Sequence, residues 1–147
     1  MRLRLGLVLV LTLFLISCGD DGSNPAIAKV TITPATASVS AGSSLILNGS
    51  AVGFGNDPLA GWYMQEAKGT PGGSYCGLDT GDPAPSWTDC PCGYVAYDTK
   101  ANGPQSEAIY HAPPTPGTFH AVYQVSAHNG FVVGLTQTTT AEITVTE

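Results

Sequence analysis

Residues 118–128, TFHAVYQVSAH, decide the fold class because their side chains alternate between an apolar set and a more polar set. The apolar set is Phe119, Ala121, Tyr123, Val125 and Ala127, and the other set is His120, Val122, Gln124, Ser126 and His128. Successive side chains of a strand point to opposite faces of a sheet, so we expect the first set to face a core. Residues 140–146 repeat the pattern, with Ala141, Ile143 and Val145 expected inside.

The rest of the chain from residue 29 onward has the same character. Short runs rich in Val, Ile, Thr and Tyr are separated by Gly, Pro, Asn and Ser, and none keeps a helical period. Strands are expected at 30–33, 38–39, 44–51, 61–65, 108–111, 118–128 and 138–146. These runs predict an all-β sandwich over 29–147. Its expected core consists of Trp62 between the sheets, packed against Leu45, Leu47, Phe119 and Tyr123.

The N-terminal residues have the layout of a secretory signal. Arg2 and Arg4 precede an uncharged stretch at 5–17, and polar residues follow. A membrane-spanning helix needs about 20 apolar residues, so this stretch is too short to span comfortably. We expect residues 1–17 to be a signal peptide and 18–28, which are small and polar, to be a flexible linker.

The end of this leader, LISC at 15–18, resembles the lipobox of bacterial lipoproteins. The resemblance implies that cleavage makes Cys18 the first mature residue and that lipid on Cys18 anchors the chain to a membrane of the cell envelope. In that family an Asp directly after the cysteine favours the inner membrane, and Gly19 in this place favours the outer one. The alternative is an ordinary cleavage site beside a chance cysteine.

Loss of the leader removes both arginines and leaves three lysines against eleven acidic residues, a net charge of −8. An acidic surface repels a phosphate backbone, and the chain has no cluster of basic residues that could release counterions. We therefore expect no nucleic-acid partner.

Several further runs resemble the bacterial Ig-like (Big) domain family of exported proteins. They are VTITP at 30–34, ASVSAGSSL at 37–45, Trp62, IYHAP at 109–113, PGTF at 116–119 and TAEITV at 140–145. The resemblance implies an Ig-like antiparallel β-sandwich and a role in adhesion or interaction. Ala121 stands where many Ig domains place the second cysteine of an inter-sheet bridge, so that disulfide is expected to be absent.

Residues 67–107 depart from the family pattern, because they form a connection far longer than an ordinary one, and loops beyond about 12–15 residues in a compact domain are usually functional or disordered. We expect a long disulfide-bearing loop insertion here, with Cys76 paired to either Cys90 or Cys92 and the third thiol left over. The segment also holds four aromatic residues, which we expect to pack it onto its own sheet: Tyr75, Trp87, Tyr94 and Tyr97.

Other chemistry has weaker signals. Asp79, Asp82 and Asp89 are candidate calcium ligands, but their spacing matches no EF-hand loop. No spacing indicates a catalytic triad, and no cofactor is expected. We therefore expect a non-catalytic module for binding, adhesion or structural interaction, with a protein or glycan partner. The alternative is a small envelope redox or metal-binding protein that uses Cys90 and Cys92.

Overall fold

The computed structural model describes residues 28–55, 58–67, 75–98, 105–128 and 133–147. The expected signal peptide, Cys18 and the linker up to residue 27 lie outside these ranges. The described elements are β1 (Lys29–Thr33), β2 (Thr36–Ser40), β3 (Ser44–Val52), β4 (Leu59–Met64), η1 (Gln65–Ala67), β5 (Gly77–Asp79), β6 (Tyr94–Tyr97), β7 (Gln105–His111), β8 (Gly117–His128) and β9 (Val133–Thr146). Within the described ranges, no helix has the length and apolar character needed to cross a membrane.

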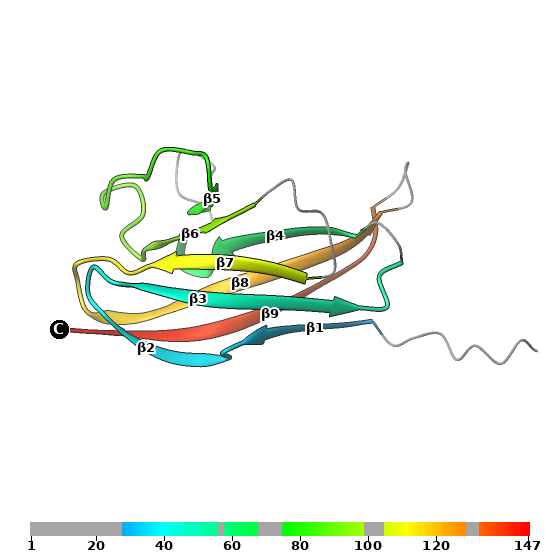
Figure 1. Ribbon diagram of the computed structural model, residues 1–147, viewed down its shortest axis with the longest axis horizontal. Coiled ribbons are helices and arrows are strands. Elements are labelled where there is room, and N and C mark those ends of the chain that lie inside the picture. Colours follow the sequence, from blue (N-terminus) through cyan, green and yellow to red (C-terminus); the bar gives the residue numbers. More distant parts are fainter. Residues whose placement is uncertain (1–27, 56–57, 68–74, 99–104, 129–132) are drawn as a thin grey trace, which may run out of the picture.

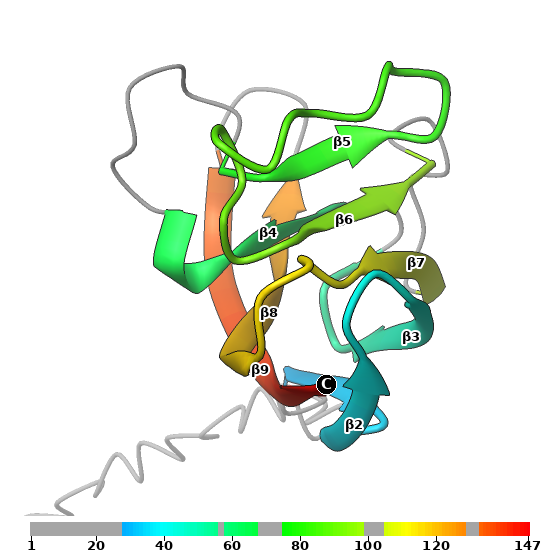
Figure 2. The ribbon, with the colours of Figure 1, turned by 90° about the vertical axis from the view of Figure 1, so that its left-hand side faces the viewer.

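Two sheets pack face to face, which confirms the expected all-β sandwich. One sheet has the order β1-β3-β7-β6-β5 and the other the order β2-β9-β8-β4. Figure 1 shows β3 and β7 in front of β8 and β9, and Figure 2 shows the two layers end-on. The order β1-β3-β7-β6 opposite β9-β8-β4 is the arrangement of the ABED and GFC sheets in immunoglobulin-type sandwiches.

The sandwich is not purely antiparallel, so that part of the expectation was wrong. β2 runs parallel to β9, and β5 runs parallel to β6. The chain passes from one sheet to the other at Pro34, between β1 and β2, and keeps its direction as it does so (Figure 1). β2 therefore lies beside the last strand in the same direction, instead of turning back on β1.

The inward set predicted from residues 118–128 is confirmed. Ala121, Tyr123 and Val125 are buried, and the two ends of the set are partly buried. On the opposite face Val122 and Ser126 are also buried, a difference from simple alternation. Val122 lies between Tyr63 on β4 and Thr140 on β9, and the Ser126 hydroxyl makes a 2.8 Å hydrogen bond with Thr136 on β9.

The expected aromatic plug is also confirmed. The rings of Trp62 and Tyr123 lie 4.7 Å apart, and Leu47 is fully buried in the same cluster, whereas Leu45 and Phe119 pack at its margin. Gly49 on β3 leaves room for both rings, since a Cβ there would lie 2.7 Å from the Tyr123 ring and 2.8 Å from the Trp62 ring.

The long insertion is more ordered than a loop. Residues 94–97, YVAY, form β6, which pairs antiparallel with β7 from Tyr94 opposite His111 to Tyr97 opposite Ala108. β5 then pairs with the outer edge of β6. β5 and β6, which lie in this insertion, therefore supply two of the five strands of the sheet. We call residues 75–98 the excursion.

Candidate functional site

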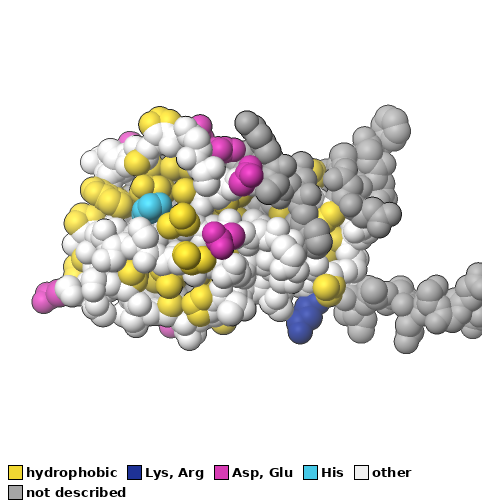
Figure 3. Space-filling model, in the orientation of Figure 1, with side chains coloured by type: hydrophobic (Ala, Val, Ile, Leu, Met, Phe, Trp, Pro, Cys, Tyr) yellow, Lys and Arg dark blue, Asp and Glu magenta, His cyan; other side chains and the backbone are white. Residues whose placement is uncertain are grey.

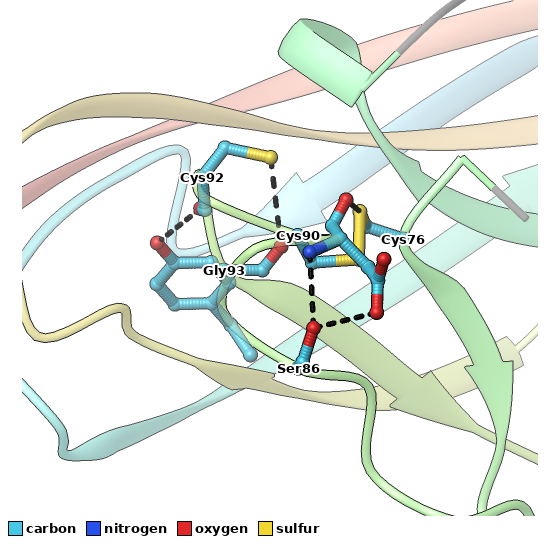
Figure 4. The surroundings of a disulfide bond; sticks show 7 residues. Cys76, Ser86, Cys90, Cys92 and Gly93 are labelled. Carbon is cyan, nitrogen blue, oxygen red and sulfur yellow. Dashed lines mark hydrogen bonds between the residues drawn. A yellow bond between two sulfur atoms is a disulfide. The ribbon is translucent and has the colours of Figure 1, made fainter. Parts of the chain in front are cut away.

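A disulfide between Cys76 and Cys90 cross-links two parts of the excursion to each other. It decides between the two pairings left open by the sequence. The Cα atoms are 5.8 Å apart, and both cysteines are buried. Figure 4 shows the bridge beside the turn that carries Ser86. The bridge joins residues 14 positions apart, so it closes a short ring that reduces the conformational entropy of the unfolded chain.

The three aspartates considered as calcium ligands hold turns of the excursion. Asp79 accepts a hydrogen bond from the backbone N–H of Gly81 (3.0 Å), and Asp82 accepts one from the N–H of Asp79 (3.3 Å). Asp89 accepts a 2.6 Å bond from the Ser86 hydroxyl. No group of three or more His, Cys, Asp or Glu side chains in the described residues is arranged to hold a metal ion. The geometry therefore gives the calcium interpretation no support.

Cys92 keeps a free thiol inside the fold. Its side chain is buried, and its Sγ donates a weak hydrogen bond to the Gly93 carbonyl at 3.5 Å (Figure 4). Burial, and next the negative charge of Glu66, raise the pKa of the Cys92 thiol to about 11. Since the thiolate is the reactive and metal-binding form, this thiol is poorly suited to either chemistry at neutral pH. With Cys90 bonded to Cys76, the two residues of the Cys-Pro-Cys run do not act as a dithiol pair.

A buried tyrosine ties this region to the sheet. The Tyr110 hydroxyl on β7 donates a 2.9 Å hydrogen bond to the Cys92 carbonyl oxygen. Gly93, at a φ of 85°, allows the close approach, because a Cβ there would lie 2.5 Å from the His111 carbonyl oxygen. The excursion is thus cross-linked internally by the disulfide and held to β7 by a buried hydrogen bond.

Three rings form a row on the outer face of the five-stranded sheet. Trp87 lies 5.8 Å from Tyr94, which stacks on His111 at 4.6 Å between ring centroids. Burial lowers the pKa of His111, whose Nδ1 is 3.0 Å from the Ser44 hydroxyl. Figure 3 shows hydrophobic side chains around a histidine on this face. Tyr94 packs onto its own sheet, as the sequence predicts, while 41% of Trp87 stays exposed.

A groove lies where the excursion meets β4, and we call it the tyrosine groove. It has a volume of about 220 Å³ and is lined by Gly61, Trp62, Tyr63, Tyr75, Gly77, Tyr97 and Gln124. Its rings come from three separate places in the chain: Tyr63 from β4, Tyr75 from the turn before β5, and Tyr97 from β6. Tyr63 and Tyr75 are 6.1 Å apart at an interplanar angle of 58°, and Tyr75 is 47% exposed.

Two backbone contacts hold the walls of this groove together. The Met64 N–H donates a 2.9 Å hydrogen bond to the Tyr75 carbonyl oxygen, which links β4 of one sheet to the excursion of the other. Gly77 packs directly on the Trp62 carbonyl, so closely that a Cβ at this position would overlap the oxygen. The groove is therefore built on close-packed backbone.

A second hollow, of about 230 Å³, lies on the outer face of the five-stranded sheet. It is lined by Thr80, Ala96, Asp98, Gln105, Ser106, Glu107 and Ile109. Unlike the tyrosine groove it includes carboxylates and no aromatic ring, and carboxylates are visible on this face in Figure 3.

The histidines do not gather into one site. His111 lies on β7 and His120 on β8 of the other sheet, while the side chain of His128 lies outside the described residues. His120 is bracketed by carboxylates that the sequence analysis did not connect with it. Its Nδ1 is 2.6 Å from Glu66, and its Nε2 is 3.8 Å from Glu142, its partner across the strands.

Of the groove residues, Tyr75 and Tyr97 stand out in the sequence as aromatic residues of the insertion, whereas Gln124 was not predicted and Tyr63 was predicted only as part of a strand. Gln124 belongs to the set of residues in 118–128 that is expected to face away from the core, and this was the one signal in the sequence that could have identified it.

A scan against protein-family models matched none of them, and a search of curated proteins found no relative.

Proposed function

We propose that this chain is a lipid-anchored module of the bacterial cell envelope that binds a partner without catalysis, as the resemblance to Big domains implies. The LISC motif at 15–18 supports the anchor at Cys18, and Gly19 favours the outer membrane. The observation that carries the proposal is the excursion, which the Cys76–Cys90 bridge cross-links internally and the pairing of β6 with β7 joins to the sandwich, with aromatic side chains left exposed.

The direction of the strands suits this role. Lys29, at the start of β1, pairs with Val52 at one end of β3, whereas Ser44 at the other end pairs with His111, which in turn pairs with Tyr94. At the usual rise of a strand, the nine residues of β3 separate these ends by about 27 Å. In a chain tethered through its N-terminal residues, the Tyr94 end of the excursion lies at the end of the sandwich opposite to Lys29, where the tether enters the fold.

The anchor is tested by expressing the full chain in a bacterial host. Mass spectrometry of the mature protein should find lipid on Cys18, and the protein should fractionate with membranes, whereas Cys18→Ala should abolish both results. An unmodified Cys18 in a protein released into the medium would refute the anchor.

Binding is tested with the lipidated full chain in liposomes, mixed with purified envelope proteins and envelope polysaccharides. We expect co-sedimentation that is lost in Cys76→Ser/Cys90→Ser and retained in the matched control Cys92→Ala, which leaves the bridge intact. Circular dichroism establishes whether the double variant is folded. If it is not, Trp87→Ala/Tyr75→Ala replaces it as the test. Equal binding by the folded double variant or by its replacement, or no binding by the unaltered chain, would contradict the proposal.

A further inference from the structure

We infer that the tyrosine groove binds one sugar unit of a neutral glycan. The inference rests on the proposed function, because it names the ligand class and the place where the module binds it.

The walls of the groove are aromatic and polar but carry no formal charge. Among the described residues that line it, none is Asp, Glu, Lys, Arg or His. A cationic ligand would find no carboxylate there, and an anionic ligand would be opposed by the net charge of −8 on the mature chain. A neutral ligand fits this environment best.

The polar atoms in the walls favour a sugar over a purely apolar ligand. A pyranose ring has apolar C–H faces, which pack on tyrosine rings, and a rim of hydroxyl groups. Tyrosine hydroxyls donate and accept hydrogen bonds, and the amide of Gln124 offers two donors and an acceptor. An aliphatic ligand would bury these groups without partners, which costs free energy.

The groove is preformed, so little ordering is needed on binding. Tyr75 and Cys76 have φ angles of 41° and 53°, in the left-handed region that side chains rarely adopt. The disulfide holds Cys76 in place, and the bond from the Met64 N–H holds Tyr75. Unfavourable backbone geometry persists where its surroundings enforce it and often marks a binding site. Here it fixes the Tyr75 ring beside Tyr63.

The size of the groove limits the ligand to one unit. Its volume of about 220 Å³ is below the range of about 300–1,000 Å³ for sites that enclose drug-sized molecules. Tyr75 is about half exposed, so the groove opens to solvent and the remainder of a glycan chain can continue outside it.

The test uses the lipidated full chain in liposomes. The probes are immobilised neutral oligosaccharides of hexoses and N-acetylhexosamines, and a polyuronate of matched length serves as the anionic comparison. We expect a neutral saccharide to bind and the polyuronate to bind at least about tenfold more weakly, a factor that corresponds to about 1.4 kcal/mol.

Three variants locate the site. Tyr75→Ala removes a wall, and Gln124→Ala removes the amide. Gly61→Val fills the groove at a position where, among the described residues, a new Cβ would have only the Tyr97 hydroxyl within 4 Å, at 3.4 Å. Each should weaken binding about tenfold. The matched control is Ile46→Ala, which removes a similarly exposed apolar side chain on β3, outside the groove, and should leave affinity within about twofold.

The outcomes separate this inference from the proposed function. If the chain binds an envelope protein but no neutral saccharide, the inference fails and the proposed function stands. If it binds nothing, both fail. Saccharide binding that survives Tyr75→Ala and Gln124→Ala in folded protein refutes the groove as the site, even if Gly61→Val does not fold. Equal affinity for the polyuronate refutes the argument from charge.

Discussion

Tyr110 and Tyr123 are both fully buried, and replacing each with phenylalanine should change stability in opposite directions. The Tyr110 hydroxyl donates to the Cys92 carbonyl oxygen at 2.9 Å, and so connects β7 to the excursion. The Tyr123 hydroxyl has no hydrogen-bond partner among the described residues, although its ring stacks against Trp62. The two substitutions remove the same atom from a bonded and an unbonded setting.

The magnitudes follow from what each change leaves behind. Tyr110→Phe removes a hydrogen bond and leaves a buried carbonyl unpaired, which should lower the free energy of unfolding by about 1–3 kcal/mol. Tyr123→Phe removes a hydroxyl that was already without a partner, and should raise the free energy of unfolding by about 1 kcal/mol. For a domain of about a hundred residues, each kcal/mol moves Tm by roughly 4–8 °C.

Urea unfolding followed by tryptophan fluorescence measures both effects in the oxidised full chain at pH 7. The dependence of the unfolding free energy on urea concentration should be the same in both variants and the unaltered chain, so that midpoints report stability alone. If Tyr123→Phe loses as much stability as Tyr110→Phe, the Tyr123 hydroxyl is hydrogen-bonded in the folded protein, and the reasoning from buried partners is wrong.

Three further changes test the excursion. Reducing the Cys76–Cys90 bridge should lower the free energy of unfolding by about 3 kcal/mol, the value for a ring of about 15 residues, and a loss below about 1 kcal/mol in paired urea titrations would contradict the loop-entropy argument. The folded pKa of Cys92 is about 11, against 9.0 for the ordinary thiol, so the unfolded chain loses this proton first. Its contribution to stability is therefore complete below pH 9 and falls as pH rises towards 11. Between pH 9 and 11 the urea midpoint should fall less steeply in Cys92→Ala than in the unaltered chain. Parallel curves for the two proteins would contradict the link between the Cys92 pKa and stability. Gly77→Ala should lower the free energy of unfolding by at least about 1–3 kcal/mol, because the new methyl group overlaps a carbonyl of β4. The control Gly61→Ala should change it by only about 0.5 kcal/mol. Equal melting temperatures of the two variants would be inconsistent with the close approach at Gly77.

The sequence predicts the central part of the sandwich well, because the side chains that fill the space between the sheets recur there at every second residue. The pattern at 118–128 identifies the inward face of β8, and Trp62 stands out as the plug between the sheets. These are properties of long strands with one face in the core, for which local pattern and final environment agree.

The excursion could be predicted only in outline. β6 is four residues long and β5 three. β6 forms a strand by pairing with β7, and β5 by pairing with β6, rather than from a pattern of their own. The sequence allows either Cys90 or Cys92 as the disulfide partner of Cys76, and only the path of the folded chain decides between them. The tyrosine groove has the same origin, since its rings lie far apart in sequence and meet where two sheets join.

The join between Met64 and Tyr75 also affects how copies of the protein behave at a crowded surface. In the lipid-anchored form proposed above, copies would be concentrated in two dimensions, where an unpaired strand edge offers a template for edge-to-edge aggregation. β4 is the edge strand of one sheet, and its Met64 N–H is already bonded within the chain. β5 is the edge strand of the other sheet, and it is only three residues long. Neighbouring molecules thus meet little open backbone on this flank, and the aromatic side chains remain available for other contacts.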